Sequence, residues 1–266
     1  MPNKSLANYP VDDIIVASKP RKRPEILRPF LIRQPETILN ILAIDTSTEA
    51  CSAALLRSDG MVFSEFEVAP RQHTRLLPKM MDAVLASAGC ARKSLSYCAF
   101  ANGPGAFTGV RIAASTAQGI GIALKIPLVP VSTLATLAQV SLDQQSGDTT
   151  LVALDARMSE VYWGVYRHGE NDLAELIGEE KLNRIADVNP DYLPSCGAGH
   201  GWSVGQETWR SWADPEIIQI DETLLPDSRA LLKLAVRAIE QGQICTSENI
   251  SINYLRNQVA EKSKKR

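Results

Sequence analysis

The stretch Ile41-Leu42-Ala43-Ile44-Asp45-Thr46-Ser47-Thr48 decides the fold. The apolar run that leads into this stretch begins at Ile38 and continues to Ile44. It predicts a strand that is buried on both faces and ends at a polar turn. A second strand, Cys51 to Leu56, follows, and Ser58-Asp59-Gly60 turns the chain into a third strand from Met61 to Val68. The sequence therefore predicts that three antiparallel strands open the fold.

The same pattern returns 110 residues later, where Val152-Ala153-Leu154-Asp155 repeats Leu42-Ala43-Ile44-Asp45. A polar turn again leads to a strand, here Glu160 to Arg167. An apolar strand ending in Asp, then a turn and an antiparallel strand, is the opening hairpin of a ribonuclease-H-like lobe. We therefore predict an α/β protein with a duplicated ribonuclease-H-like fold of the actin-like ATPase (ASKHA) superfamily, with a reduced second lobe. Chance similarity between two buried strands is the alternative, because only four residues align.

Two helices of the first lobe carry distinct stripes. A wide apolar stripe predicts a helix over residues 71–89, with Pro78 in its first turn or kinking its entry. A strand (97–101) and a glycine-rich loop lead to a second predicted helix over 110–124, which carries a stripe of small residues. Each stripe fits either the core of the chain or a helix contact with another subunit. The stripes consist of Leu76, Leu77, Met80, Met81, Val84 and Leu85, and of Ala113, Ala117 and Gly121.

Composition places the chain among ordinary globular proteins. Its 266 residues are 45% hydrophobic and 22% charged, with a net charge of −2, which argues against a basic nucleic-acid wrapper and a disordered acidic tail. Five widely spaced cysteines without a C-x-x-C pair argue against a disulfide framework or zinc knuckle, and predict a reduced, cytoplasmic setting. No apolar run approaches the roughly 20 residues of a membrane span.

Charge and proline are unevenly distributed. Residues 1–37 hold six of the 15 prolines and a charge of +3, so the rest of the chain carries −5. We therefore predict a disordered basic extension over 1–37, a first lobe over 38–148 and a second lobe over 149–266. The second lobe offers a helix from about Asp227 to Gln241 and few other elements after its hairpin.

The superfamily suggests a nucleotide site, which the sequence supports poorly. Actin-like ATPases wrap phosphates with Asp-x-Gly turns, because glycine lets backbone amides approach closely. The equivalent turns here, Asp45-Thr46-Ser47 and Asp155-Ala156-Arg157, lack that glycine, and Arg157 is bulky. Asp45 and Asp155 remain candidates for Mg²⁺, although polar caps at strand ends are the favoured interpretation. The loop Gly197–Gly201 is a weak candidate for adenosine contact.

A second candidate for anion binding is the loop that precedes the second helix. Gly103-Pro104-Gly105 lies before that helix, with Thr108 and Arg111 nearby, and its amides either cradle an anion or shape the turn. The three histidines show no metal-binding spacing, and no serine or cysteine has the surroundings of a nucleophile. The sequence therefore predicts neither a metal site nor an autonomous hydrolase.

Several motifs together resemble the bacterial TsaB family, also called YeaZ. They run in order from about Ile38 to Ala260, and the third is highly specific to that family. They are Ile41 to Ser52, Arg71-Gln72-His73-Thr74, Gly103-Pro104-Gly105-Ala106-Phe107-Thr108-Gly109-Val110-Arg111, Val131-Ser132-Thr133-Leu134, Asp155 to Trp163 and Tyr254-Leu255-Arg256-Asn257.

The resemblance implies a role in making N6-threonylcarbamoyladenosine, the modified adenosine beside the anticodon of tRNA. It implies a non-catalytic subunit that pairs with TsaD and activates it, alongside the ATPase TsaE, and that forms a homodimer without TsaD. It also implies that ATP or ADP and metal belong to the partner subunits, that tRNA is met indirectly through the complex, and that the two striped helices contact TsaD. We therefore expect those stripes to serve both core and interface.

Two departures from the family leave alternatives open. Residues 1–37 are additional, and they are a mis-called start, a tail or a basic arm that touches tRNA. The alternative functions are an ATP-dependent kinase or phosphotransferase of the actin-like fold and, less favoured, a glycoprotease-like peptidase. The first lacks its phosphate loops here, and the second lacks a nucleophile and a metal.

Overall fold

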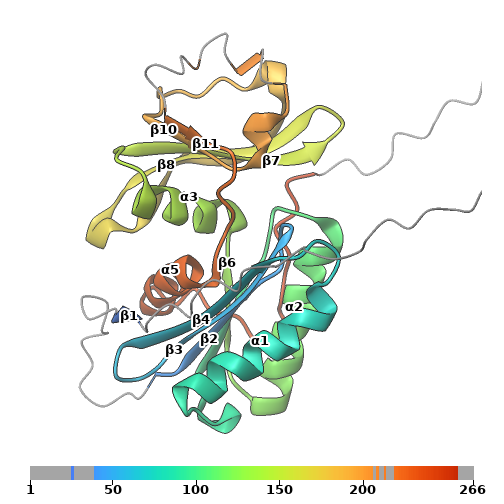
Figure 1. Cartoon of the computed structure of the whole chain (residues 1–266), viewed down its shortest axis with the longest axis vertical. Coiled ribbons are helices and arrows are strands. Elements are labelled where there is room, and N and C mark those ends of the chain that lie inside the picture. The colour runs from blue at the N-terminus through green and yellow to red at the C-terminus, as the bar shows by residue number, and fades with distance from the viewer. Residues whose placement is uncertain (1–24, 27–38, 206–207, 210–212, 214–218, 257–266) are drawn as a thin grey trace, which may run out of the picture.

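Two β-sheets with helices between and outside them form the computed structural model of the chain (Figure 1). It describes residues 25–26, 39–205, 208–209, 213 and 219–256. The predicted extension over 1–37 lies outside the described residues except for Glu25–Ile26, which form the short strand β1. That strand pairs antiparallel with Met61 and Val62, so this part of the extension joins the first sheet.

The first sheet has the strand order β1-β4-β3-β2-β5-β6. β2 pairs antiparallel with β3 and parallel with β5, and β3 continues antiparallel to β4. The three antiparallel opening strands are thus confirmed. Besides β1, the strands are β2 (Ile41–Asp45), β3 (Ala50–Leu56), β4 (Met61–Val68), β5 (Tyr97–Ala101) and β6 (Leu128–Val131).

The second sheet repeats this topology with the strand order β11-β10-β7-β8-β9. β7 pairs antiparallel with β8 and parallel with β10, as β2 pairs with β3 and β5. The repeated strand order confirms the duplicated ribonuclease-H-like fold. The strands are β7 (Thr149–Arg157), β8 (Glu160–His168), β9 (Ala174–Arg184), β10 (Cys196–Ala198) and β11 (Gln219–Asp221).

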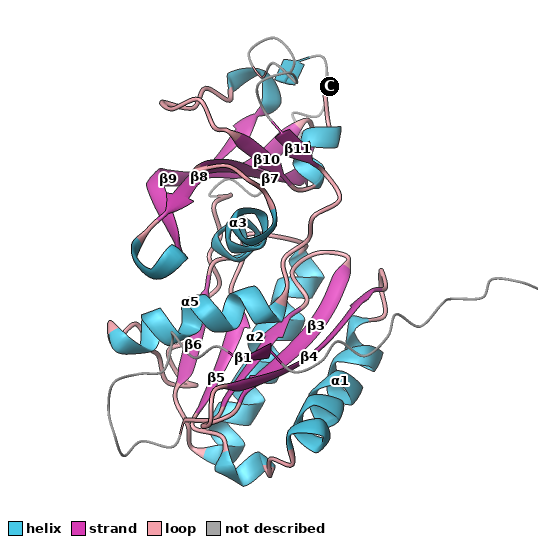
Figure 2. Cartoon of the chain, turned by 60° about the vertical axis from the view of Figure 1, so that its left-hand side comes forward, coloured by secondary structure: helices cyan, strands magenta, loops and turns pink. Residues whose placement is uncertain are grey.

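Each lobe lends a helix to the sheet of the other lobe. α3 (Thr133–Gln144) follows the first sheet but packs on β7, β8 and β9, whereas α5 (Ser228–Glu240) follows the second sheet but packs on β2, β3 and β6. The two helices also contact each other between the sheets (Figure 2). One buried apolar cluster therefore runs from the first sheet through both helices to the second, so the boundary predicted at residue 148 divides the chain but not the core.

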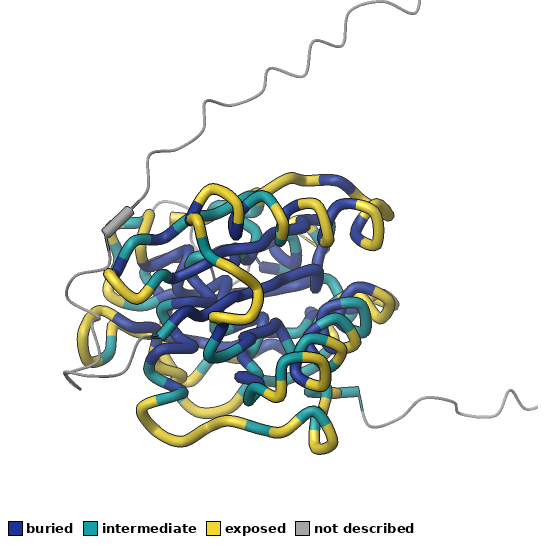
Figure 3. Tube along the Cα trace, turned by 90° about the horizontal axis from the view of Figure 1, so that it is seen from below, coloured by how far each residue is buried: buried dark blue, intermediate teal, exposed yellow. Residues whose placement is uncertain are grey.

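The outer face of the first sheet is covered by α1 (His73–Ala88) and α2 (Phe107–Leu124), as Figure 2 shows. Figure 3 shows a buried interior and exposed outer turns on the helices. The outer face of the second sheet is covered by a tryptophan-rich cluster that includes Trp202 and Trp209. Four short 3₁₀ helices complete the described elements: η2 (Arg92–Ser94), η3 (Glu170–Asp172), η4 (Ile185–Asp187) and η5 (His200–Ser203).

Local sequence signals explain where most elements begin or end. Two predicted positions differ from the structure. Ser132 caps α3 by accepting the amides of Leu134 and Ala135, as its position before the helix predicts. Pro78 lies inside α1, in its second turn, so the first of its two predicted places, the first turn, was wrong. α2 begins at Phe107, three residues earlier than predicted, which takes part of the glycine loop into the helix.

The structure bears on two expectations for the whole chain, namely the state of the cysteines and the presence of membrane spans. All five cysteines are free thiols, as their spacing predicts. Within the described residues, the helices are all too short or too polar to cross a membrane.

Candidate functional site

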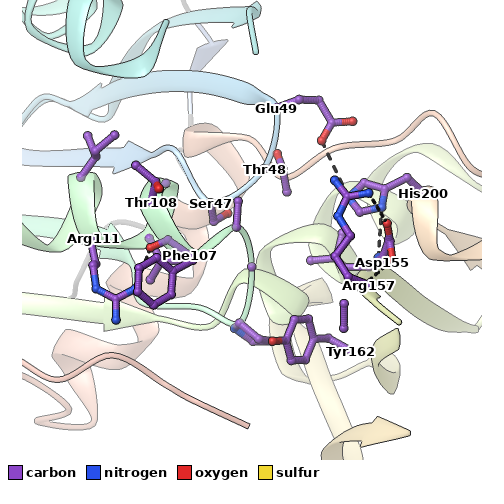
Figure 4. Close-up of a pocket in the computed structure, with 18 of the residues that line it drawn as sticks. Ser47, Thr48, Glu49, Phe107, Thr108, Arg111, Asp155, Arg157, Tyr162 and His200 are labelled. Carbon is purple, nitrogen blue, oxygen red and sulfur yellow. Dashed lines mark hydrogen bonds and ion pairs between the residues drawn. The ribbon is translucent and has the colours of Figure 1, made fainter. Parts of the chain in front are cut away.

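A cleft of about 1460 Å³ lies between the lobes, at the carboxyl ends of β2 and β7. Ligands of α/β sheets commonly bind at this edge, which makes the cleft the leading candidate site. Figure 4 shows side chains from both lobes facing it, with Phe107 and Arg111 on one side and Arg157 and His200 on the other.

The Asp45 turn at the floor of the cleft is closed on itself. One carboxylate oxygen, Oδ1, accepts the Ser47 amide at 2.7 Å and the Ser47 hydroxyl at 2.6 Å. The Thr46 hydroxyl donates to the Gly109 carbonyl at 2.7 Å, which ties the turn to α2. Burial raises the pKa of Asp45 to about 6, and its Oδ2 atom has no hydrogen-bond partner among the described residues.

The Asp155 turn of the second lobe is closed in the same way. Its Oδ1 accepts the Arg157 amide at 2.7 Å, and its Oδ2 pairs with the Arg157 guanidinium at 2.9 Å. In both lobes the amide two residues after the Asp is therefore bonded to the Asp side chain. A phosphate-binding turn needs that amide to be free, so these turns are built as polar strand caps.

The glycines in the loop before α2 and in its first turn allow close backbone packing. A Cβ on Gly105 would lie 2.4 Å from the Ser47 carbonyl oxygen, and one on Gly109 would lie 1.9 Å from that of Thr46. The Ala106 amide donates to the Ser47 carbonyl at 2.8 Å. Gly103, with φ of 102°, leaves no room beside the Asn253 carbonyl. These contacts favour the shaping role of the loop over an anion cradle.

Arg111 projects into the cleft next to two aromatic rings. Its guanidinium lies 3.3 Å from the centroid of Phe107 and 5.2 Å from that of Tyr254, and it donates to the Phe107 carbonyl at 2.9 Å. Thr108, the other polar residue predicted here, is exposed in the first turn of α2 and also lines the cleft. Sequence reasoning missed the two rings, although both stand in the family motifs.

His200 bridges the lobes at the back of the cleft. Its Nδ1 accepts the Asp155 amide at 3.1 Å, which assigns the ring proton to Nε2, and Nε2 lies 3.7 Å from the Glu49 carboxylate. Neither ring nitrogen is left to serve as a base. His200 lies within the glycine loop considered for adenosine, where Gly199 and Gly201 pack tightly against Ala153, so that loop is a close-packed turn.

Metal ligands do not gather in the cleft. Within the part of the chain that the structure describes, no group of three or more His, Cys, Asp or Glu side chains could hold an ion. His73 is buried and bonds the Ala50 carbonyl at 3.2 Å.

The predicted partner-interface stripes are mostly buried within this chain, which agrees with the core part of their predicted role, and their part in an interface stays a prediction. On α1 the stripe packs against β3 and β4, and only Met81 is partly exposed. On α2 the small residues face the sheet, and a Cβ on Gly121 would lie 3.0 Å from Leu128. The buried residues of the two stripes are Leu76, Leu77, Met80, Val84, Leu85, Ala113, Ala117 and Gly121.

The exposed face of α2 carries a row of two small residues and an isoleucine, which sequence reasoning missed. Ser115, Gly119 and Ile122 lie four and three residues apart and are all exposed, with Ile122 63% exposed. A Cβ on Gly119 would have no atom within 4 Å. The signal was present as Ser-x-x-x-Gly, two residues out of step with the buried stripe.

Comparison with known proteins places this architecture. The family model for TsaD, a tRNA N6-adenosine threonylcarbamoyltransferase, matches residues 65–192. A solved structure of YeaZ from Pseudomonas aeruginosa superposes with a TM-score of 0.75 at 39% identity, covering 82% of this chain and 100% of that one.

Two relatives carry the same name, tRNA threonylcarbamoyladenosine biosynthesis protein TsaB. The protein from Escherichia coli is 36% identical over 236 residues, which are 84% of this chain and 97% of the relative. The protein from Haemophilus influenzae is 32% identical over 239 residues, 84% of this chain and 96% of the relative. The chain therefore belongs to the TsaB family of tRNA threonylcarbamoyladenosine biosynthesis proteins.

Proposed function

We propose that this chain is a non-catalytic subunit that pairs with TsaD and activates it during threonylcarbamoyladenosine synthesis on tRNA. The observation that carries the proposal is the pair of closed turns at Asp45 and Asp155. An actin-like phosphotransferase needs those amides for phosphate, and a hydrolase needs a base such as His200, whose two nitrogens are engaged.

Pairing would use the exposed face of α2. The row Ser115, Gly119 and Ile122 offers a shallow, partly apolar surface on which a second helix can approach closely. The same face would serve a homodimer when TsaD is absent, because helix pairing of this kind needs only a complementary helix. TsaE would then act on the pair.

Nucleotide and metal would reside on the partner subunits. The closed turns and the scattered histidines of the described residues support that assignment. We place the complex in the cytoplasm, which agrees with five free thiols.

Two measurements on the full chain test the proposal. Light scattering during size-exclusion chromatography should show a complex of the chain with TsaD, and the isolated chain should hydrolyse ATP no faster than a buffer blank. Failure to bind TsaD, or turnover of the isolated chain near ~10 s⁻¹, would overturn it.

A further inference from the structure

The cleft contains an aromatic shelf, made of Phe107, Arg111 and Tyr254. Phe107 is 70% exposed and Tyr254 is 50% exposed, although both line a deep concave surface. The Arg111 guanidinium lies against the Phe107 ring, and it is 5.2 Å from the centroid of the Tyr254 ring. Large exposed rings inside a cleft are typical of surfaces that receive another flat group.

The cleft also holds more positive than negative charge. Four arginines and two carboxylates line it, namely Arg71, Arg111, Arg157, Arg256, Glu49 and Asp155. Arg157 pairs with Asp155 at 2.9 Å, and Arg256 pairs with Glu160 at 2.6 Å. Among the described residues, Arg71 and Arg111 form no ion pair with a carboxylate. Two guanidinium groups are therefore available to an anion.

The turns that line the cleft and the volume of the cleft indicate which kind of anion it binds. The turns at Asp45 and Asp155 engage their own amides at Ser47 and Arg157, which favours the arginine side chains as donors to a phosphate. The volume of about 1460 Å³ exceeds the roughly 300–1,000 Å³ of small-molecule pockets, so the cleft has room for an extended segment. Single-stranded RNA supplies phosphates for arginine and bases that stack on aromatic rings.

We propose that the cleft between the lobes binds a short single-stranded segment of tRNA, with phosphates at Arg71 and Arg111 and bases on Phe107 and Tyr254. The inference rests on the proposed function, since tRNA is then the substrate of the complex. It replaces the expectation of purely indirect contact with tRNA. The net charge of −2 does not oppose it, because screening confines surface electrostatics to about 8–10 Å.

Fluorescence anisotropy of a labelled, unmodified anticodon stem-loop RNA, titrated with the full chain, tests the inference. Phe107→Ala should weaken binding about tenfold, the equivalent of one lost base stack. Arg111→Gln should weaken binding and reduce the slope of log K against log salt by about 0.7. A fully paired duplex of the same length should bind more weakly than the stem-loop.

Matched controls lie outside the cleft. Phe66→Ala removes a ring that is 44% exposed on β4, and Arg92→Gln removes an exposed cation on η2, and both should bind RNA like the wild type. The inference fails if the wild type does not bind the stem-loop, or if cleft and control variants bind it equally. It also fails if poly-glutamate competes as well as RNA of equal charge, because the cleft would then be a site for acidic peptide.

Failure of this inference is distinguishable from failure of the proposed function. A wild-type chain that binds TsaD and supports tRNA modification, yet shows no RNA binding, contradicts this inference. The proposed function is unaffected by that result. A chain that does not bind TsaD contradicts the proposed function, whatever its affinity for RNA.

Discussion

Asp45 is a buried carboxylate whose pKa departs from its ordinary value. Burial without a partner for Oδ2 raises its pKa from 3.8 to about 6. The folded chain therefore binds a proton that the unfolded chain releases between pH 4 and pH 6. This group thus favours folding most below pH 4, and that contribution is lost as the pH rises through 6.

Asp45→Asn should remove this pH dependence, because asparagine keeps an oxygen for the Ser47 amide and has no proton to lose. The free energy of unfolding at pH 8 should rise by about 2–3 kcal/mol over the wild type, with little difference at pH 4. Urea unfolding of both proteins at several pH values measures this difference. A gap that does not vary with pH would show that Asp45 does not titrate in this range.

Two glycines of α2 should respond oppositely to the same substitution. Gly109→Ala places a methyl group against the Thr46 carbonyl and should destabilise the chain by about 3 kcal/mol. Gly119→Ala meets open space and should stabilise the helix by about 1 kcal/mol. Thermal unfolding followed by circular dichroism compares them, and equal midpoints for the two variants would contradict the packing described at Gly109.

At the scale of the element, α2 presents two faces with different tasks. Ala117 is 0% exposed and faces the sheet, whereas Gly119 is on the outer face. The helical period of the sequence identified the buried residues correctly, but periodicity does not say what covers a stripe. The core of this chain covers most of the stripe, and we therefore propose the opposite side of the helix for pairing.

Substitutions on the two faces should separate folding from pairing. Gly119→Arg should leave the chain folded and weaken TsaD binding at least tenfold, because a long side chain blocks close helix approach. Ala117→Arg should unfold the chain, since a charge would enter the core. Leu176→Arg, on the partly exposed β9 of the other lobe, is the control. Normal TsaD binding by folded Gly119→Arg would exclude this face.

β1 adds only two residue pairs to the edge of β4. A chain that begins at Leu39 should therefore lose about 1 kcal/mol of stability or less and should support tRNA modification at the full rate. Urea unfolding and a modification assay check both expectations. Loss of modification by the folded truncated chain would assign the extension a direct role.

Strand ends were predictable where strong turn signals stand beside them. β4 and β5 have the predicted bounds, since glycine lies close to each. β9 was missed because most of its residues are polar and only partly buried, so no alternation marks it. β10 and β11 have three residues each, too few to show a period.

Part of the candidate site could be predicted from the sequence, because it follows from the repeated strands. Asp45 and Asp155 end the repeated strands, so the duplication alone brings the turns that follow them to one cleft. Tyr254 comes from the far end of the chain, where only the fold carries it across to Arg111. The sequence indicated the two lobes. It did not indicate that α3 and α5 each pack on the sheet of the other lobe.

At the scale of the whole molecule, this exchange joins the lobes through one shared core. The cleft therefore sits on a frame whose two walls are fixed by the same helices. Such a frame suits a subunit that holds a partner or a substrate in place. The closed turns within it support the proposal that the chemistry belongs to another subunit.

Reconstituted tRNA modification tests this central claim most directly. TsaD, TsaE and the enzyme that makes threonylcarbamoyl-adenylate are combined with unmodified tRNA, ATP, threonine and bicarbonate, with and without the full chain. Modified adenosine should form only when the chain is present, in amounts that saturate near equimolar TsaD, and His200→Ala should retain activity. Modification at the same rate without the chain, or by the chain without TsaD, would contradict the account.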